Sequence, residues 1–236
     1  MRILYIFPHP DDESFGPALA ISRQRREGHD VHLLTLTRGE ATSQRDRMGL
    51  TKEEMGRVRV GEMECVRGVL GLAGLTVLTF PDAQLAHLDP RDLENAVARH
   101  IRRVRPHVVV TYAVHGISRF PDHLVTHAVV KRVFCEMRDE EPGLAPRRLA
   151  LFTLSEQEEA DEGPFPLATS PAEDIDVAET VSEEDLQTAR EALNCHQSYQ
   201  DVIETAAPLE RTGTTVYFEL FQESHVPRLT SIVSGL

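Results

Sequence analysis

The 236-residue chain has no tryptophan, three cysteines and 6% aromatic residues. Cys65, Cys135 and Cys195 lie far apart without a CxxC spacing, so we expect no disulfide framework and no thiolate zinc site, but three core residues. A run of about 18 apolar residues is also lacking, which argues against a membrane-spanning helix. The apolar stretch at the start is too short for a secretion signal. These absences predict a soluble, cytoplasmic protein.

Basic residues are scarce relative to acidic ones. Lys and Arg total 25 against 38 Asp and Glu, a formal net charge of −13. Such a charge disfavours nucleic acid or an anionic membrane surface as a partner and favours a small molecule. With 41% hydrophobic residues, the chain is long enough for one substantial core, and we expect a single domain over residues 1–236.

Short apolar runs alternate with helical patterns along the chain. This alternation predicts an α/β fold with a mainly parallel sheet covered by helices on both faces. The acidic segment 155–176, rich in Pro and Ser, is expected to be an exposed or mobile loop, or a lid. The predicted strands are 2–7, 30–37, 75–80, 107–112 and 147–154, and the predicted helices lie within 15–28, 57–72, 91–103, 124–138 and 182–199.

A cluster of polar residues follows the first predicted strand, where open α/β sheets bind their ligands. Imidazole and carboxylate together suit zinc, and His9 and Asp12, three residues apart across a proline turn, can face one ion. Asp11 would then remain free to act on water. The alternative is a helix N-cap, Asp11 or Asp12, beside a surface histidine.

A second cluster follows the strand 107–112. His123 can complete a metal site with His9 and Asp12, or it can bind the ion together with His127, one helical turn later. The alternative is that Asp122 caps the helix and His127 packs against the sheet.

These motifs resemble those of the PIG-L/LmbE-like zinc N-deacetylases. The specific pair is HPDDE at 9–13 and PDH at 121–123, and weaker similarities lie at 37–40 (TRGE), 57–72 and 189–200. The resemblance implies a Rossmann-like sheet, which agrees with the predicted fold. It also implies an enzyme that removes the acetyl group of N-acetylglucosamine attached to inositol, phosphatidylinositol or malate. Members of the family often form homo-oligomers.

The resemblance assigns roles to matching positions. His9, Asp12 and His123 match the ligands of zinc, for which another divalent metal could substitute, and Asp11 matches the general base. Asp122 matches the aspartate that holds a catalytic histidine.

That histidine is missing here, because the family's His-Pro-Asp-His reads Phe120-Pro-Asp-His in this chain. Phenylalanine can neither steady an oxyanion nor protonate an amine. His115, five residues earlier, is the candidate replacement, with Asp11 acting as both base and acid as the alternative. His115 could instead brace the turn before Gly116.

Several other residues are predicted to line or support the site. Arg119 matches an arginine that binds a substrate carboxylate in the malate-linked, bacillithiol-type branch, although a loop arginine is often simply solvated. Arg59 and Glu62 could contact substrate or pair with each other. Glu13 and Glu40 are expected to orient His9 or line the pocket, and His196 resembles a family position near the site. The predicted substrate-binding set is Arg59, Arg119 and Glu40.

The chain is therefore predicted to be a zinc-dependent hydrolase that removes an N-acetyl or other N-acyl group from an N-acetylglucosamine-type conjugate. One alternative is a metal-dependent sugar-binding protein with little hydrolytic activity, because of Phe120. A second alternative keeps hydrolysis but prefers a longer acyl chain. The apolar segment 226–236, if exposed, could contribute to a homo-oligomer interface.

Overall fold

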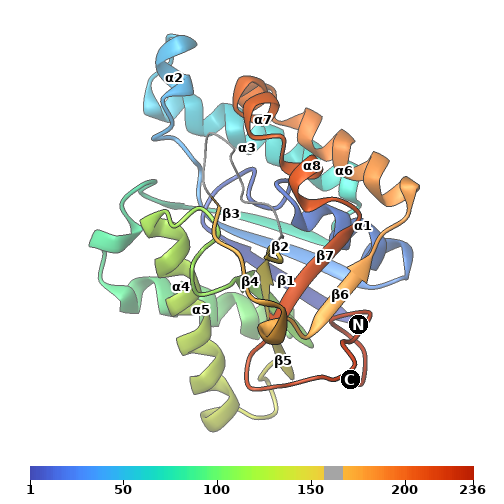
Figure 1. Ribbon diagram of the computed structural model, residues 1–236. Coiled ribbons are helices and arrows are strands. Elements are labelled where there is room, and N and C mark those ends of the chain that lie inside the picture. Colours follow the sequence, from blue (N-terminus) through green and yellow to red (C-terminus); the bar gives the residue numbers. More distant parts are fainter. Residues whose placement is uncertain (157–166) are drawn as a thin grey trace.

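A computed structural model describes residues 1–156 and 167–236, and within them the strands form one sheet with helices on both faces (Figure 1). The strands are ordered β3-β2-β1-β4-β5-β7-β6 across the sheet, and neighbours among the first five are parallel. The predicted α/β, mainly parallel fold is confirmed. The strands are β1 (Arg2–Phe7), β2 (Asp30–Thr37), β3 (Gly74–Phe80), β4 (Val108–Tyr112), β5 (Arg148–Thr153), β6 (Val177–Thr180) and β7 (Thr215–Leu220).

The helices fall into two layers. α4 and α5 pack against each other on one face, while α1, α3 and α6 pack together on the other, as Figure 1 shows. The helices are α1 (Pro17–Arg26), α2 (Gln44–Arg47), α3 (Lys52–Leu70), α4 (Pro90–Val104), α5 (Pro121–Glu140), α6 (Glu183–Cys195), α7 (Gln200–Ala206) and α8 (Pro208–Thr212), with short 3₁₀ turns η1 (Leu85–His87), η2 (Ala172–Asp174) and η3 (Gln197–Tyr199).

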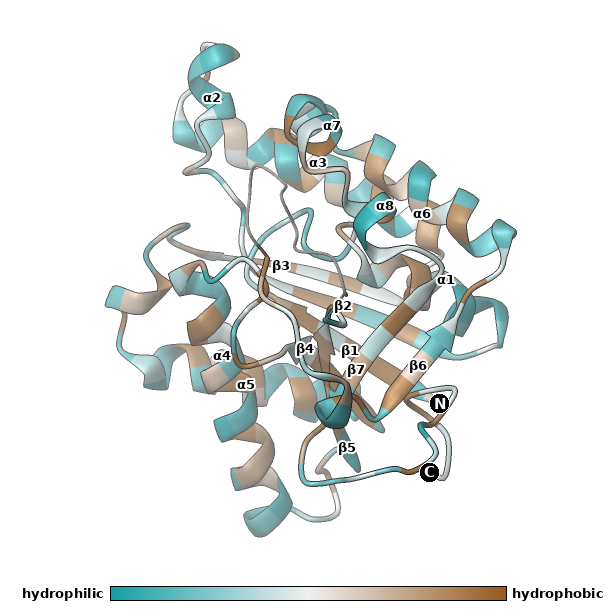
Figure 2. Ribbon diagram, viewed as in Figure 1, coloured by the Kyte–Doolittle hydropathy of each residue, from teal (hydrophilic) through white to brown (hydrophobic). Residues whose placement is uncertain are grey.

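The central strand β1 explains why the sheet is buried on both faces. Its alternate side chains enter two different cores: Tyr5 and Phe7 pack toward α1 and α3, while Leu4 and Ile6 pack toward α4 and α5. The apolar colouring of the strands and the hydrophilic outer faces of the helices follow this division (Figure 2).

The order of the strands decides where a ligand can bind. The chain begins in the middle of the sheet with β1, adds β2 and β3 on one side, and then crosses to β4 on the other side of β1. The loops that follow β1 and β4 therefore diverge, which leaves a crevice at the carboxyl ends of these two strands. Both predicted polar clusters lie in these loops.

The antiparallel end of the sheet was not predicted. β7 pairs antiparallel with both β5 and β6, and along β7 buried and half-buried residues alternate. An alternating strand carries a weaker apolar signal than β1, β4 and β5, which are continuous buried runs. Within the predicted acidic loop, residues 157–166 lie outside the described residues. Of its flanks, Ser155 and Ser170 form an isolated β-bridge and Ser170 is buried.

The expectation that all cysteines are unpaired core residues is wrong. Cys65 on α3 and Cys195 at the end of α6 form a disulfide, with their Cα atoms 5.7 Å apart. The two residues are 130 positions apart in the chain, and only the packing of α3 against α6 brings them together. Cys135 is a free thiol.

The ends of the elements follow local rules. Ser182 and Asp185 form a capping box at the start of α6, and Thr51 and Glu54 form another at the start of α3. The segment 226–236 folds back onto the chain: Leu229 bridges to Val177, and the Ile232 side chain is fully buried. Among the described helices, no stretch has the length and apolar character needed to span a bilayer.

Candidate active site

The β1 loop (residues 8–16) is a tight turn stabilised by its own hydrogen bonds. The Asp11 carbonyl accepts from the amides of Ser14 and Phe15, and the His9 amide donates to the Asp12 carboxylate at 2.8 Å. Asp11 adopts φ 87°, a conformation that few non-glycine residues take but that Asp tolerates better than most. This strained position directs the Asp11 and Asp12 carboxylates to different sides of the turn.

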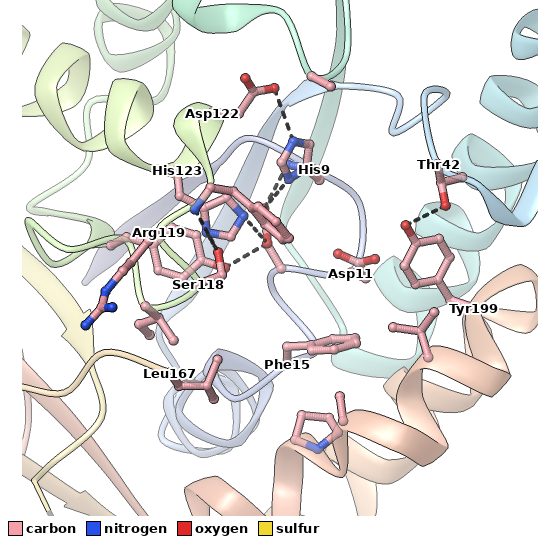
Figure 3. Close-up of a pocket in the computed structure, with 18 of the residues that line it drawn as sticks. His9, Asp11, Phe15, Thr42, Ser118, Arg119, Asp122, His123, Leu167 and Tyr199 are labelled. Atoms are coloured by element: carbon pink, nitrogen blue, oxygen red, sulfur yellow. Dashed lines mark hydrogen bonds and ion pairs between the residues drawn. The ribbon is translucent and has the colours of Figure 1, made fainter. Parts of the chain in front are cut away.

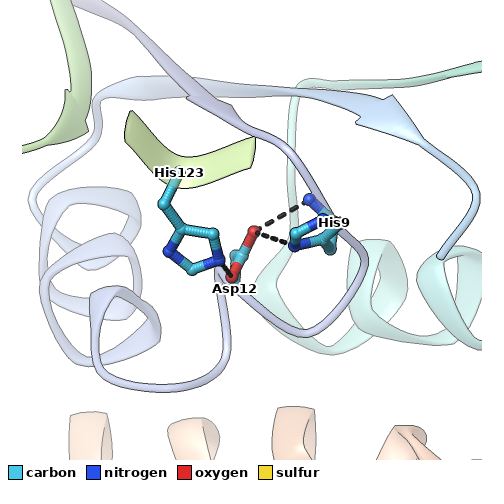
Figure 4. A group of neighbouring side chains, drawn as sticks. All are labelled: His9, Asp12 and His123. Carbon is cyan, nitrogen blue, oxygen red and sulfur yellow. Dashed lines mark hydrogen bonds and ion pairs between the residues drawn. The ribbon is translucent and has the colours of Figure 1, made fainter. Parts of the chain in front are cut away.

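His9, Asp12 and His123 converge at one point (Figure 4). The His9 Nδ1 atom lies 3.5 Å from Asp12 Oδ2, and the His123 Nε2 atom lies 3.3 Å from Asp12 Oδ1. Asp12 and His123 are buried and His9 is half-buried. The three residues predicted as metal ligands are thus brought together from the β1 loop and the first turn of α5.

The tautomer of His123 follows from its partners. Its Nδ1 atom lies 3.0 Å from the Gly116 carbonyl, which can only accept, so Nδ1 carries the proton. Ser118 Oγ lies 3.2 Å from the same nitrogen. The Nε2 lone pair is then free and faces Asp12, which is the orientation that a metal ligand needs. Burial also lowers the pKa of His123, which favours the neutral ring.

The other side of His9 faces two more carboxylates. The Nε2 atom lies 3.3 Å from both Asp82 Oδ1 and Asp122 Oδ2. Asp122 also accepts from the Leu85 amide, and Asp82 from the Ala41 amide at 2.6 Å. Asp122 therefore holds His9 and does not cap its own helix.

Asp82 is not among the site residues predicted from the sequence. A pattern in the sequence could have identified Asp82. Pro81-Asp82 directly follows the predicted strand 75–80, and another Pro-Asp pair, Pro10-Asp11, lies shortly after the first predicted strand. In a parallel sheet those ends meet on one edge.

These carboxylates give the site a strong preference for positive charge. Burial lowers the pKa of His9, but Asp12, Asp122 and Asp82 together outweigh burial and raise it to about 10. Burial likewise raises the pKa of Asp12, yet His123 and His9 lower it to about 2. Three carboxylates around one imidazole, with the neutral His123 ring beside them, are a donor set that suits a divalent cation such as zinc.

Asp11 lies apart from the three ligands and is held by Arg59. The buried Arg59 guanidinium donates to Asp11 Oδ2 and to the Pro10 carbonyl, both at 2.6 Å, and to the Gly39 carbonyl at 3.1 Å. Gly39 has φ 64°, and a Cβ there would lie 1.9 Å from the guanidinium, so the glycine of TRGE leaves room for this arginine. Arg59 also stacks over the Tyr199 ring at 4.2 Å.

The surroundings of Asp11 change its acidity. Burial raises the pKa of Asp11 to about 6, although the Arg59 guanidinium opposes that rise. A carboxylate with this pKa can accept a proton near neutral pH and release it again within one catalytic cycle.

A cavity of about 720 Å³ opens above these residues (Figure 3). Thr42 and Tyr199 lie beside Asp11 and are joined by a hydrogen bond from the Tyr199 hydroxyl, 2.8 Å long. Phe15 and Leu167 lie on another side. The size is that of a pocket for a whole small-molecule ligand.

The β4–α5 loop (residues 113–120) supplies the other rim of the cavity. Phe120 lines it with 59% of its surface exposed, and its ring lies 5.8 Å from that of His123. Arg119 also lines the cavity, with its side chain extending away from His9 (Figure 3). Arg59 lines it as well, so two of the three predicted substrate-binding residues border the cavity.

Two other predicted residues are placed elsewhere. His115 is not among the cavity-lining residues: its Nε2 atom lies near Ser170 and Thr153, and its Nδ1 accepts from the Ile117 amide. The alternative expectation, that it braces the turn, fits this geometry. Glu40 accepts from the Asp82 amide and does not line the cavity.

His127 packs in the core, as one alternative expected. Its Nδ1 atom donates to the Tyr112 carbonyl at 2.8 Å. Among the described residues two groups are compatible with a metal, His9 with Asp12 and His123 and His9 with Asp82 and Asp122, and His127 belongs to neither.

Two buried contacts stabilise the elements that carry the site. His196 Nε2 lies 2.9 Å from Glu13, and both side chains are fully buried. Glu62 forms neither a pair with Arg59 nor a contact with the cavity; it accepts from the amide and hydroxyl of Ser198. Glu13, Glu62 and His196 therefore fix the β1 loop and α3 to the turn after α6.

A known protein family matches the part of the chain that contains this site. The family described as PIG-L: GlcNAc-PI de-N-acetylase matches residues 4–134, which include every residue of the three-ligand group and Asp11. The match covers more than half of the chain.

Individual relatives match this chain over only part of their length. A 1D-myo-inositol 2-acetamido-2-deoxy-alpha-D-glucopyranoside deacetylase of Kineococcus radiotolerans is 32% identical over 158 residues, which are 56% of this chain and 44% of the relative. A mycothiol S-conjugate amidase of Streptomyces coelicolor is 33% identical over 161 residues, 60% of this chain and 54% of the relative. The chain spans about half the length of the curated relatives it matches.

The fold also has solved counterparts. The crystal structure of a conserved protein from Thermus thermophilus superposes with a TM-score of 0.70 and 23% identity, covering 95% of this chain and 97% of that one.

Proposed function

This chain belongs to the PIG-L family, and from that premise we propose that it is a metal-dependent hydrolase that removes the N-acetyl group from an N-acetylglucosamine conjugate. The observation that carries the proposal is the convergence of His9, Asp12 and His123 beside a fourth residue, Asp11, whose carboxylate is held by Arg59 and lies outside this group, in one cavity. An amide hydrolase needs such a separation between the groups that hold a metal and the group that moves a proton.

We propose zinc as the resident ion. Two imidazoles and one carboxylate are a usual ligand set for catalytic zinc, which keeps a further position open. When bound, the ion supplies Lewis acidity, which polarises the amide carbonyl and makes water more acidic. Asp82 and Asp122 hold His9 from its other ring nitrogen and so orient it toward the ion.

Asp11 then serves as the base. With a pKa of about 6 it is ionised at neutral pH, and the Arg59 ion pair fixes the direction of its carboxylate. Asp11 takes a proton from water as the water oxygen bonds to the acyl carbon. It then returns the proton to nitrogen as the carbon–nitrogen bond breaks. This second role answers the loss of the family's histidine at Phe120, and His115 does not line the cavity.

The exposed Phe120 also favours a second candidate. Without an acid at this position, the protein could bind a sugar conjugate through the metal and release little product.

One experiment separates the two functions. We expect the purified chain, stripped with a chelator and reloaded with zinc, to release acetate and free amine from glycosides of N-acetylglucosamine only in the reloaded form. Zinc-dependent binding of the same glycosides without release would establish the binding protein instead. Release that is equally fast in the stripped form would reject metal-dependent hydrolysis.

A further inference from the structure

The cavity has two chemically different walls. One wall, the polar wall, consists of Asp11, Thr42, Arg59, Asp82 and Tyr199. A second wall, the apolar wall, consists of Phe15, Ile117, Phe120, Phe152, Leu154 and Leu167, and Arg119 and Arg211 also line the cavity. Figure 3 shows the contrast: Thr42, Tyr199 and Asp11 lie together on one side, while Phe15 and Leu167 lie on another.

The apolar wall begins directly at a predicted metal ligand. The rings of Tyr112 and His123 are stacked with their centroids 4.5 Å apart, and the Phe120 ring meets His123 edge-on at 5.8 Å. From Tyr112 the aromatic contact continues to Phe152 at 6.2 Å. Apolar surface therefore extends from His123 into the cavity, beside Arg119, which also lines it.

The apolar wall is also built into the fold. Phe152 is a buried residue of β5, and Leu154 follows this strand. The Ala168 amide donates to the Ile117 carbonyl and the Ser170 amide to the Leu154 carbonyl, both at 2.8 Å, which holds the segment from Leu167 against the β4–α5 loop. These hydrogen bonds thus fix the backbone that carries Ile117, Leu154 and Leu167.

The proposed reaction decides which part of a substrate meets each wall. Its amide carbon must lie beside His9, Asp12, His123 and Asp11, with the sugar on the nitrogen side and the acyl group on the carbon side. The hydroxyls of the sugar need polar partners, which the hydroxyls of Thr42 and Tyr199 on the polar wall offer. The acyl group then faces Phe120 and the rest of the apolar wall.

We propose that the preferred substrate carries an N-acyl chain longer than acetyl, an aliphatic chain that lies along the apolar wall. This inference rests on the proposed function and narrows its substrate class. A methyl group would leave most of this apolar surface in water, whereas each added methylene removes more of it. Water bonds to the acyl carbon, the carbon–nitrogen bond breaks, and the water proton passes to nitrogen, which gives a fatty acid and a free glucosamine conjugate.

Two matched substrate series test the proposal. In the first, methyl glucosaminides carry N-acyl chains of two, four, six and eight carbons; in the second, the N-acetyl group is constant and the alkyl aglycone lengthens. We expect kcat/KM to rise roughly three- to fourfold for each methylene of the acyl chain until the wall is covered. A rise along the aglycone series instead, or equal rates for all acyl lengths, would overturn the proposal.

A variant locates the effect on the wall. Leu167→Gln should flatten the dependence of kcat/KM on acyl length, because it places a polar amide in the apolar wall. The control is Val114→Gln, because Val114 is 65% exposed and does not line the cavity. Circular dichroism checks the folding of both variants. A full chain-length dependence in Leu167→Gln would contradict the assignment of the wall.

Binding distinguishes this proposal from the proposed function. Titration calorimetry of Asp11→Asn with the same acyl series needs no turnover. Affinity that grows with acyl length, without release by the parent, would uphold the acyl site and reject the hydrolase. Release of acetate with affinity and kcat/KM independent of acyl length would uphold the hydrolase and reject the acyl site.

Discussion

The two loops that form the site are built differently. The β1 loop buries Asp12, Glu13 and Ser14 and is fixed by Arg59 and His196, whereas the β4–α5 loop leaves Val114 65% and Phe120 59% exposed. Both loops lead to buried ligands, Asp12 in the first and His123 after the second. The proposed metal ligands are thus interlocked with the core, whereas position 120, where the family carries a histidine, lies at the surface.

This difference indicates which residues of the site can be replaced without disturbing its buried contacts. A change in the β1 loop disturbs several buried contacts at once, because Arg59 bonds to Pro10, Asp11 and Gly39 together. A change at position 120 disturbs an exposed ring. Phenylalanine can therefore replace the family's histidine without disturbing the ligand set.

The largest expected effect is the loss of a ligand from either loop. His9→Ala and His123→Ala should each bind far less than one zinc per chain and lose at least about 1,000-fold in turnover, because zinc with two protein ligands is poorly held. The measurements are metal content and amine release. His87→Ala, an exposed histidine on η1, is the control. Full zinc content in either variant would remove that residue from the ligand set.

A smaller effect is expected for the carboxylate that joins the two loops. Asp122→Asn weakens the hydrogen bond to His9 Nε2, so zinc affinity should fall about 10- to 100-fold, as when other partners that orient a metal-bound histidine are removed. Competition with a chromogenic chelator measures it. Unchanged affinity would show that Asp82 orients His9 alone.

Each loop has a buried histidine that stabilises it: His196 contacts Glu13 of the β1 loop, and His127 contacts the Tyr112 carbonyl just before the β4–α5 loop. His196→Ala leaves the buried Glu13 carboxylate with only the hydrogen bond from the Ser14 hydroxyl, while His127→Ala removes a hydrogen bond to a backbone carbonyl. The first should lower the free energy of unfolding by about 2 kcal/mol more than the second. Urea unfolding at neutral pH measures both. Equal losses would mean that the buried pair adds nothing to the stability of the β1 loop.

The smallest effect is expected at Phe120. Phe120→His should raise turnover of an N-acetyl substrate only a few-fold, because Asp11 already moves the proton and a second donor adds less than the usual factor of about 100. Phe120→Leu is the matched control that keeps an apolar side chain. Turnover by Phe120→His that rises more than about 100-fold would show that Asp11 is a poor acid in the parent.

The parallel part of the fold and the residues at the centre of the proposed site could be predicted from the sequence. Strands buried on both faces are continuous apolar runs, and His9, Asp12 and His123 follow the ends of such strands, where the topology must bring them together. The four-residue strand β6 and the strand β7, in which buried and half-buried residues alternate, carry a weaker signal.

The remaining features depend on tertiary packing that has no local pattern. The Cys65–Cys195 disulfide requires α3 to lie on α6, and the contact of Glu62 with Ser198 has the same origin. The direction of His115 is decided by Thr153 and Ser170, which are distant in sequence.

The central claim is that one carboxylate, Asp11, moves the proton while three other residues hold the metal. Zinc content and amine release of Asp11→Asn, measured on the same preparation beside the parent chain, test it most directly. The account predicts unchanged zinc content and a loss of turnover of about 100- to 10,000-fold. Turnover within about tenfold of the parent, at equal zinc content, would contradict it.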